Sequence, residues 1–466
     1  MNQRMILGAK DRPKTGKWFL LSFQHVFAMF GATILVPILT GLPISVALFT
    51  SGVGTLIYIV CTRAKVPVYL GSSFAYITPI IAVSGFNPEL GIAGSYGAVL
   101  TGLFTVGIVY IIIAVVIKFA GTKWINVVFP PIIIGPMIAI IGFGLSGSAV
   151  SNAGLISGGD WKVMLVALVS VLIVAFVAIK AKGFFKIIPF LSGIVGGYIL
   201  GAALGLIDFA PVIAVLKAPA QWFGLPEFIF LGFKDASYVV GSSTITVAKI
   251  SFAALMTILP LAFVTACEHI GDHAVLSEIT GEDYLQDPGL HRTMLGDGIA
   301  TAFAALFGGP ANTTYGENTS VVGMTRVGSV WVTGLAAVIA ICLSFINVFI
   351  AVINTIPLAV MGGICIILYG FIGMNGIKVL INSKVDLNKT RNMIIASAML
   401  VIGLGGAVIG ITNETINFTL SGMSLAAVVG VLLNLILPRK ESEVIHSEDL
   451  KIETETSDSE KIETGE

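Results

Sequence analysis

Long apolar runs separated by short polar connections fill most of this 466-residue sequence, and they constrain its fold more than any other feature. A helix needs about 20 apolar residues to cross the hydrocarbon core of a bilayer. A polar stretch at 208–246 divides the runs into two groups of about seven. Because only 11% of the residues are charged, against about 25% in soluble domains, the sequence predicts an all-α polytopic membrane protein with about 14 transmembrane segments. The runs span residues 18–41, 44–62, 68–84, 94–117, 124–145, 161–180, 187–207, 247–272, 292–307, 310–323, 329–350, 355–373, 391–411 and 415–437.

The lysine and arginine residues predict the orientation of these segments. Cytoplasmic connections of membrane proteins carry an excess of both residue types. If residues 1–17 are cytoplasmic, only four of the 26 basic residues fall on the opposite side: Lys162, Lys217, Lys234 and Lys249. A miscounted segment would scramble this bias from the error onward. We therefore expect an even number of segments, a multi-pass protein of the cell membrane and both termini in the cytoplasm.

Two of the runs, 68–84 and 310–323, are short and are interrupted by Gly, Pro, Ser, Thr and Asn. Each is the third in its group of seven, and because seven is odd, the two groups would cross the membrane in opposite directions, as an inverted repeat. Paired interrupted segments are the best sequence indication of a binding site near the bilayer midplane. Irregular backbone at that depth also occurs where it is buried in protein, so two re-entrant packing loops are the alternative.

Both interrupted runs read as an extended piece followed by the start of a half-helix. In the first, residues 68–70 are too few for a helix, and a half-helix would start near Ser72–Ser73. In the second, residues 312–315 would be extended and Gly316–Glu317 would open a helix. A helix start presents free N–H groups and the positive end of the helix dipole. Two such starts meeting at the midplane would form a polar cradle.

A cluster of ionisable residues follows the apolar part of the run 247–272. It comprises Glu268, His269, Asp272 and His273. A charged side chain inside the bilayer costs roughly 2.5–3.5 kcal/mol on insertion scales, so such residues are usually functional. Glu268 and Asp272 are four residues apart, and a helix would place both carboxylates on one face. The alternative is a helix end that emerges into water, where the two histidines would be solvated.

The residue types in these segments predict a neutral, planar ligand. The cradle offers backbone N–H donors, the carboxylates of Glu268 and Glu317, and the rings of Phe74, Tyr315 and Tyr369. Carboxylates accept hydrogen bonds from N–H groups, backbone N–H groups donate to carbonyl oxygens, and aromatic rings cover a flat face. A cyclic amide with alternating N–H and C=O groups fits this set. A cation site would not need the rings, and an anion would be repelled by ionised glutamates.

Uphill movement of a neutral ligand needs a coupled ion, and the sequence offers proton-binding groups for this purpose. Desolvated carboxylates can bind and release protons near neutral pH. Glu268, Asp272 and Asp297 are the candidates, and His273 could relay protons. His25, inside the first run, is expected to be structural or to line the site.

Other classes of function find little support. The net charge is zero, which gives no basic surface for nucleic acid. No set of residues has the spacing of a metal site, the four cysteines lie in apolar runs, and no nucleophile–base pair is evident. We therefore expect no metal, no cofactor and no enzymatic activity.

At these residues the chain resembles the nucleobase–cation symporter 2 family, also called nucleobase–ascorbate transporters. Within that family, it is most similar to the bacterial uracil:proton symporters. The likeness covers residues 15–440. The motifs that carry it are Gln24–His25, Gly71–Ala75, Glu268–Gly271, Gly296–Gly298 and Asn312–Asn318.

The resemblance implies a seven-plus-seven inverted repeat with a substrate-carrying core domain and a gate domain that usually dimerises. The lipid bilayer and a second copy of the chain are thus expected partners. The implied regions are a cytoplasmic N-terminus (1–17), core segments 1–4 (18–123), gate segments 5–7 (124–207), an extracellular loop (208–246), core segments 8–11 (247–350), gate segments 12–14 (351–437) and a disordered cytoplasmic tail (438–466).

The resemblance also implies roles for individual residues. Glu268 and Glu317 would bind the N–H and carbonyl edge of a pyrimidine, and Tyr369 would close over its ring from the gate. The implied substrate-binding residues are Glu268, Glu317, Phe74, Tyr315, Gly316, Tyr369, Ser73 and His25; the implied proton-coupling residues are Glu268, Asp272, His273 and Asp297.

The substrate is expected to be uracil, imported with protons by alternating access. Uracil carriers of the family have Glu at the position of Glu317, whereas xanthine and urate carriers commonly have Gln. The sequence departs from the best-known uracil symporter pattern at one position, where Asp272 replaces a His, and this difference argues against uracil as the substrate. A xanthine or urate permease of the same family is therefore the alternative, followed by a passive channel.

Overall fold

The computed structural model describes residues 5–86, 92, 94–121, 123–182, 185, 188–229, 236–240, 243–247, 251–412 and 417–438. The predicted disordered tail (438–466) lies outside the described residues apart from residue 438, and so does part of the predicted extracellular loop (208–246).

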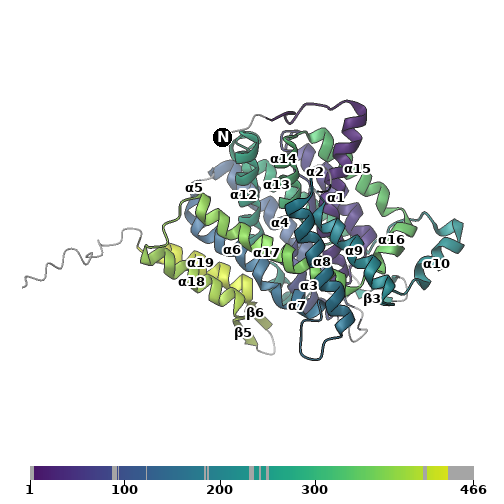
Figure 1. The fold of residues 1–466 in the computed structure, drawn as a ribbon. Coiled ribbons are helices and arrows are strands. Elements are labelled where there is room, and N and C mark those ends of the chain that lie inside the picture. Colours follow the sequence, from purple (N-terminus) through teal and green to yellow (C-terminus); the bar gives the residue numbers. More distant parts are fainter. Residues whose placement is uncertain are drawn as a thin grey trace, which may run out of the picture.

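Helices make up most of the described chain (Figure 1). Those of the first half are α1 (Thr15–Thr40), α2 (Ile44–Cys61), α3 (Ile77–Ser84), α4 (Gly97–Ala120), α5 (Lys123–Val128), α6 (Pro131–Gly144), α7 (Ser146–Asn152), α8 (Trp161–Lys180) and α9 (Pro189–Ala203). The connection between the halves contains α10 (Ala210–Lys217) and the paired strands β2 (Ala236–Val240) and β3 (Ser243–Val247). The second half contains α11 (Phe252–Ile258), α12 (Leu261–Thr280), α13 (Leu290–Phe307), α14 (Gly316–Thr325), α15 (Val330–Ser344), α16 (Asn347–Asn354), α17 (Leu358–Asn382), α18 (Thr390–Leu404) and α19 (Gly422–Ile436), with the paired strands β5 (Val408–Thr412) and β6 (Asn417–Ser421) before α19.

Seven helices of the described chain are long and apolar enough to cross a membrane. Two of them continue through a kink, so that α6 joins α7 and α11 joins α12. Proline explains two breaks in the predicted runs: Pro130 separates α5 from α6, and Pro260 separates α11 from α12. A proline lacks the backbone N–H and its ring clashes with the preceding turn.

The ionisable cluster lies inside a helix and not at its end. α12 continues to Thr280 and stops at Gly281, whose φ of 77° suits glycine. His269 and His273 are fully buried in the middle of this helix. The alternative of a helix end emerging into water here is therefore wrong, because the helix continues beyond His273 to Thr280 and Leu276, on its next turn, is also buried.

The two interrupted runs each contain the predicted extended piece, and these two pieces pair with each other. β1 (Leu70–Ser72) pairs antiparallel with β4 (Asn312–Thr314), with Gly71 opposite Thr313. A single helical turn at Phe74–Tyr76 leads from β1 into α3, and α14 starts directly after β4. The first helical turn thus begins just after the predicted Ser72–Ser73.

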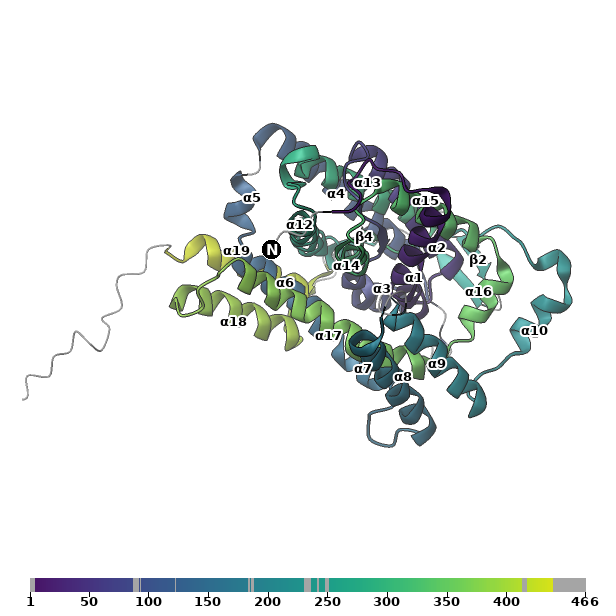
Figure 2. The same cartoon turned by 45° about the horizontal axis from the view of Figure 1, so that its top comes forward.

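The remaining helices form two groups, and each group combines both halves of the chain (Figures 1 and 2). In one group α13 packs on α2 and α4, and α15 packs on α1 and α2. In the other group α17 packs on α6, α7 and α8, and α18 packs on α6 and α19. The first group contains helices of the predicted core domain and the second contains helices of the predicted gate domain; α12 contacts α4 and α14 of the first and α6 and α19 of the second. The division into core and gate domains stays a prediction.

A glycine allows α6 and α17 to pack closely, and its substitution should destabilise the protein. A Cβ on Gly142 would lie 2.2 Å from the backbone N of Gly373. Overpacking of this kind costs about 1–3 kcal/mol, so we expect Gly142→Ala to lower the melting temperature of the purified protein by several degrees. Gly144→Ala is the matched control, because its Cβ would meet nothing within 4 Å and alanine favours a helix over glycine. Equal melting temperatures for the two variants would contradict the prediction.

Candidate functional site

A cavity of about 750 Å³ lies between α12, α14 and α17. Glu268 and Asp272 on α12 and Glu317 at the start of α14 are in its lining. The lining follows α12 from residue 268 to 279 and α17 from residue 368 to 383. The cavity therefore extends from the middle of these helices toward their C-terminal ends.

Helical spacing places the lining residues on one face of each helix. α14 contributes Glu317, Ser320 and Met324, at intervals of three and four residues. The face of α17 is mostly apolar, and its polar members in the C-terminal half of the helix are Asn375, Lys378 and Asn382. The wall of the cavity formed by α12 and α14 is thus acidic, and the wall formed by α17 is largely apolar.

The crossing strands hold the ring of Tyr315 in place beside the cavity. Its hydroxyl donates to the carbonyl oxygen of Ser72 (3.1 Å) and accepts from the hydroxyl of Thr33 (3.3 Å). Its backbone N–H donates to the carbonyl oxygen of Tyr69 (3.2 Å). A Cβ at Gly71 would lie 2.3 Å from the ring, so only glycine lets the ring pack on β1.

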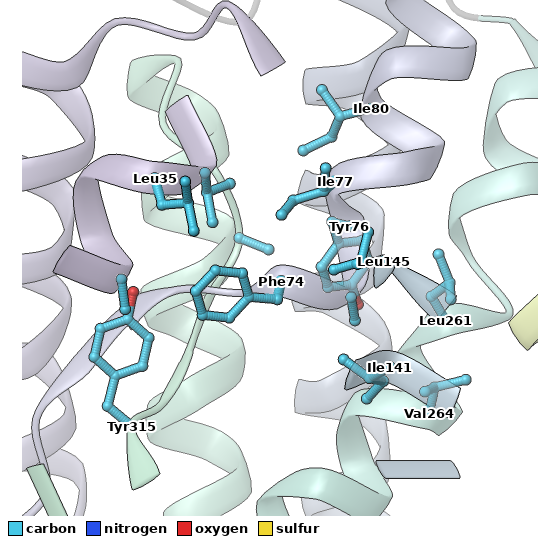
Figure 3. Close-up of a cluster of buried hydrophobic side chains, with 14 of the residues drawn as sticks. Leu35, Phe74, Tyr76, Ile77, Ile80, Ile141, Leu145, Leu261, Val264 and Tyr315 are labelled. Atoms are coloured by element: carbon cyan, nitrogen blue, oxygen red, sulfur yellow. The ribbon is translucent and has the colours of Figure 1, made fainter. Parts of the chain in front are cut away.

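Phe74 closes the cavity at the end opposite to the C-terminal ends of α12 and α17. Figure 3 shows its ring within a cluster of buried apolar side chains from α1, α3, α6 and α12. Leu35, Ile80 and Leu145 of this cluster are at most 4% exposed and are not in the cavity lining. The Tyr369 ring meets the Phe74 ring edge-on, with centroids 6.0 Å apart. The cavity is therefore open in one direction and sealed by packed apolar side chains in the other.

The carboxylates of α12 differ in their hydrogen bonds. The Thr314 hydroxyl, at the end of β4, donates to Oδ2 of Asp272 (2.6 Å). Oε2 of Glu268 and the hydroxyl of Thr313 are both buried and have no hydrogen-bond partner among the described residues. A buried polar atom without a partner costs free energy, so a ligand that supplied one would be favoured at Glu268.

A second polar network lies behind the cavity wall, between α12, α13 and α2. His269 contacts Oδ2 of Asp297 through Nδ1 (2.9 Å) and the hydroxyl of Thr293 through Nε2 (3.0 Å). His273 donates from Nδ1 to the carbonyl oxygen of His269 (2.7 Å), so in the neutral ring Nε2 accepts from the Tyr58 hydroxyl. All five side chains are at most 1% exposed. The network fastens α12 to its neighbours directly behind Glu268.

His25 is also held behind the wall. The amide nitrogen of Asn318, next to Glu317 on α14, lies 3.0 Å from Nδ1 of His25 and donates to its backbone oxygen (3.1 Å). This bond joins α1 to α14. Ser73 is likewise buried, and its backbone N–H donates to the carbonyl oxygen of Ala311 (2.8 Å).

The structure thus separates the predicted site residues into two sets. Those in the cavity lining are Phe74, Glu268, Asp272, Tyr315, Gly316 and Glu317. Those buried outside the lining are His25, Ser73, His273, Asp297 and Tyr369, each at most 2% exposed. Their functional roles stay predictions.

Sequence reasoning missed the polar residues that α17 and the second turn of α14 bring to the cavity. Asn375, Lys378 and Asn382 lie beyond the predicted run 355–373, because α17 continues to Asn382. Ser320 follows Glu317 by three residues and so shares its face. Helical spacing from Glu317 predicts that Ser320 lies on the same face, but no motif marks the three polar residues of α17.

Comparison with known proteins supports a transporter fold. A family model described as "Permease family" matches residues 16–412. A uracil permease of Bacillus caldolyticus is 48% identical over 437 residues, which cover 93% of this chain and 95% of the relative. A uracil permease of Bacillus subtilis (strain 168) is 45% identical over 447 residues, which cover 95% and 97%.

A solved structure shows the same fold at low sequence identity. The transmembrane domain of a cyanobacterium bicarbonate transporter, BicA, matches with a TM-score of 0.59 at 14% identity, covering 92% of this chain and 100% of the domain. The predicted helical membrane fold with an inverted repeat is confirmed, and the exact number of segments stays a prediction. Together with the family model and the two relatives, which cover nearly the whole chain, this fold shows that the protein belongs to the permease family that its motifs resemble.

Proposed function

We propose that this chain is a secondary active transporter that imports uracil together with protons across the cytoplasmic membrane. The observation that carries the proposal is the meeting of Glu268 and Glu317 in one cavity, beside two crossed strands that each lead into a helix start. The relatives named uracil permease indicate the substrate.

The chemistry of the cavity suits a pyrimidine with N–H and C=O groups on its edge. Glu268 has a buried oxygen without a partner among the described residues; it can accept from such an edge when ionised and donate to it when protonated. The first turn of α14 has N–H groups that no helical carbonyl accepts, and they can donate to a carbonyl oxygen of the base. Glu317 is the second residue of that turn. Phe74 offers an apolar face, and Tyr369 supports its ring.

Proton coupling follows from the charge of the acidic wall. Uracil is neutral at physiological pH, so the membrane potential alone cannot drive its uptake. An ionised carboxylate is expensive to move through an apolar barrier, whereas a protonated one is not. Binding of a proton at Glu268 or Asp272 would therefore let the site with bound uracil switch from facing outward to facing the cytoplasm. The proton and uracil would then be released into the cytoplasm.

Alternating access would take place by motion of the core domain against the gate domain. With both termini in the cytoplasm, the C-terminal ends of α12 and α17 face inward, and the cavity opens to the cytoplasm. The apolar cluster around Phe74 would then be the closed outer gate. We further propose that the protein forms a homodimer through its gate domain (124–207 and 351–437).

Loss of the Thr314 hydroxyl should weaken transport by disturbing Asp272. Thr314→Val keeps the side-chain shape and removes the 2.6 Å hydrogen bond to Asp272. We expect the KM for uracil to rise about tenfold, the equivalent of about 1.4 kcal/mol, which is close to the lower end of the range for hydrogen bonds to charged groups. Thr105→Val is the control, because the hydroxyl it removes donates to the carbonyl oxygen of Thr101 within α4 (2.8 Å) and Thr105 is not in the cavity lining. Equal KM values for both variants would show that the bond to Asp272 plays no part.

The test of the proposed function is uptake of labelled uracil into proteoliposomes, with and without an inward proton gradient. Accumulation that needs the gradient and disappears with a protonophore would support the proposal. Uptake that only equilibrates would favour a passive channel. Uptake that excess xanthine or urate abolishes, with slow transport of uracil itself, would favour a purine permease.

A further inference from the structure

An uncompensated cluster of basic residues precedes the first helix. Lys10, Arg12, Lys14 and Lys17 are all exposed, and among the described residues no carboxylate forms an ion pair with any of them. The one acidic residue within the cluster, Asp11, accepts the backbone N–H of Gly8 (2.8 Å). The first turn of α1 contains no acidic residue, and cations at a helix N-terminus face the positive end of its dipole. The cluster therefore favours an anion from outside the chain.

Two tryptophans form the floor of this cluster. The indole N–H of Trp18 donates to the carbonyl oxygen of Trp331 (2.7 Å), and that of Trp331 donates to the carbonyl oxygen of Lys10 (3.2 Å). The guanidinium carbon of Arg12 lies 4.4 Å from the centroid of the Trp18 ring and 5.6 Å from that of Trp331. A guanidinium stacked on aromatic rings keeps its N–H groups available for a bidentate contact with a phosphate.

The backbone around the cluster is fixed before any ligand binds. The segment 5–12 runs alongside the connection between α14 and α15, as the purple segment of Figure 1 shows. Gly328 donates to the carbonyl oxygen of Leu7 and Val330 donates to that of Ala9, both at 2.9 Å. A site that is already ordered loses little conformational entropy on binding.

We propose that the N-terminal segment and the first turn of α15 bind the headgroup of an anionic phospholipid. Trp18 and Trp331 lie at the starts of helices that lead into the apolar part of the protein, and tryptophan is enriched at the membrane interface. Groups of four or more basic residues next to a transmembrane helix attract anionic lipids of the cytoplasmic leaflet. The connection held by this segment follows α14, the helix of Glu317, so the lipid would also brace the substrate-site helix.

Lipid binding by the full-length protein tests this proposal without any transported substrate. The purified protein in detergent is titrated with phosphatidylglycerol or phosphatidylcholine, and bound lipids are counted by native mass spectrometry. We expect tighter binding of phosphatidylglycerol, and Arg12→Gln/Lys14→Gln should weaken that binding about 30-fold, from about two charges near the surface. Lys162→Gln/Lys217→Gln, on the opposite side in the predicted orientation, should leave it unchanged.

A second double variant and a competition experiment separate the headgroup site from a general loss of stability and from binding of free phosphate. Lys14→Gln/Lys17→Gln spares the Arg12 stack, and a loss of phosphatidylglycerol binding at an unchanged melting temperature in phosphatidylcholine would support the headgroup site. Inorganic phosphate is added in competition; full displacement of the lipid by millimolar phosphate would overturn the lipid assignment. Binding of phosphatidylglycerol by the Arg12→Gln/Lys14→Gln variant as tightly as by the unmodified protein would overturn the site itself. Either failure leaves the proposed transport function untouched.

Discussion

Substitution of Glu268 by glutamine should abolish proton-driven accumulation of uracil, with a loss of at least about 100-fold in initial uptake rate. Such a loss corresponds to about 2.7 kcal/mol, within the range for a hydrogen bond to a charged group. Glutamine has nearly the same shape as glutamate, so the packing of α12 should persist. It cannot bind and release a proton, however, and its amide N–H₂ presents a donor where the pyrimidine N–H needs an acceptor.

The comparison that isolates this effect uses a second glutamate of the same helix. Glu278 also lines the cavity but is exposed near its mouth, ten positions after Glu268. We expect Glu278→Gln to accumulate uracil at close to the unmodified rate. Binding of uracil, measured by isothermal titration calorimetry, separates loss of coupling from loss of the site. Normal gradient-driven uptake by Glu268→Gln would remove Glu268 from both proposed roles.

The local features of the site were predictable from the sequence because they depend on backbone chemistry. Glycine, proline and small polar residues inside an apolar run exclude a continuous helix, and the two crossing strands lie where these residues occur. The proximity of Glu268 and Asp272 on one face follows from helical spacing alone. The inverted order of the halves follows from an odd number of segments in each.

Contacts between distant helices could not be predicted in the same way. The pairing of His269 with Asp297 joins residues 28 positions apart through the packing of α12 on α13, and no local pattern specifies that packing. The same holds for Asn318 and His25, which are 293 positions apart. His273 and Asp297 were predicted as proton-coupling residues from their type, yet they lie outside the cavity lining. Their part in coupling stays a prediction, and a route for protons would have to pass through the network behind Glu268.

Substitution of Glu317 by alanine should likewise lower uracil uptake at least about 100-fold, for a reason that differs from that of Glu268. Glu317 is the acidic residue in the first turn of α14, where a carboxylate interacts with the helix dipole by about 0.3–1 kcal/mol. That term is too small to unfold the protein, so the loss would come from the missing contact to the base. The melting temperature of the variant should therefore stay within a few degrees of that of the unmodified protein.

Glu317→Gln distinguishes recognition of the base from a purely structural effect. Glutamine retains one oxygen acceptor and adds an N–H₂ donor, so it should bind uracil more weakly than glutamate does and should tolerate a substrate that presents an acceptor at that point. We expect inhibition by xanthine or urate to strengthen relative to inhibition by uracil in Glu317→Gln, measured by competition in proteoliposomes. If selectivity is unchanged in Glu317→Gln while Glu317→Ala is inactive but stably folded, Glu317 acts on the conformational change and not on the choice of base. If both variants transport uracil normally, the proposed site is wrong, because the cavity would then bind its substrate without the helix start that the crossed strands place beside it.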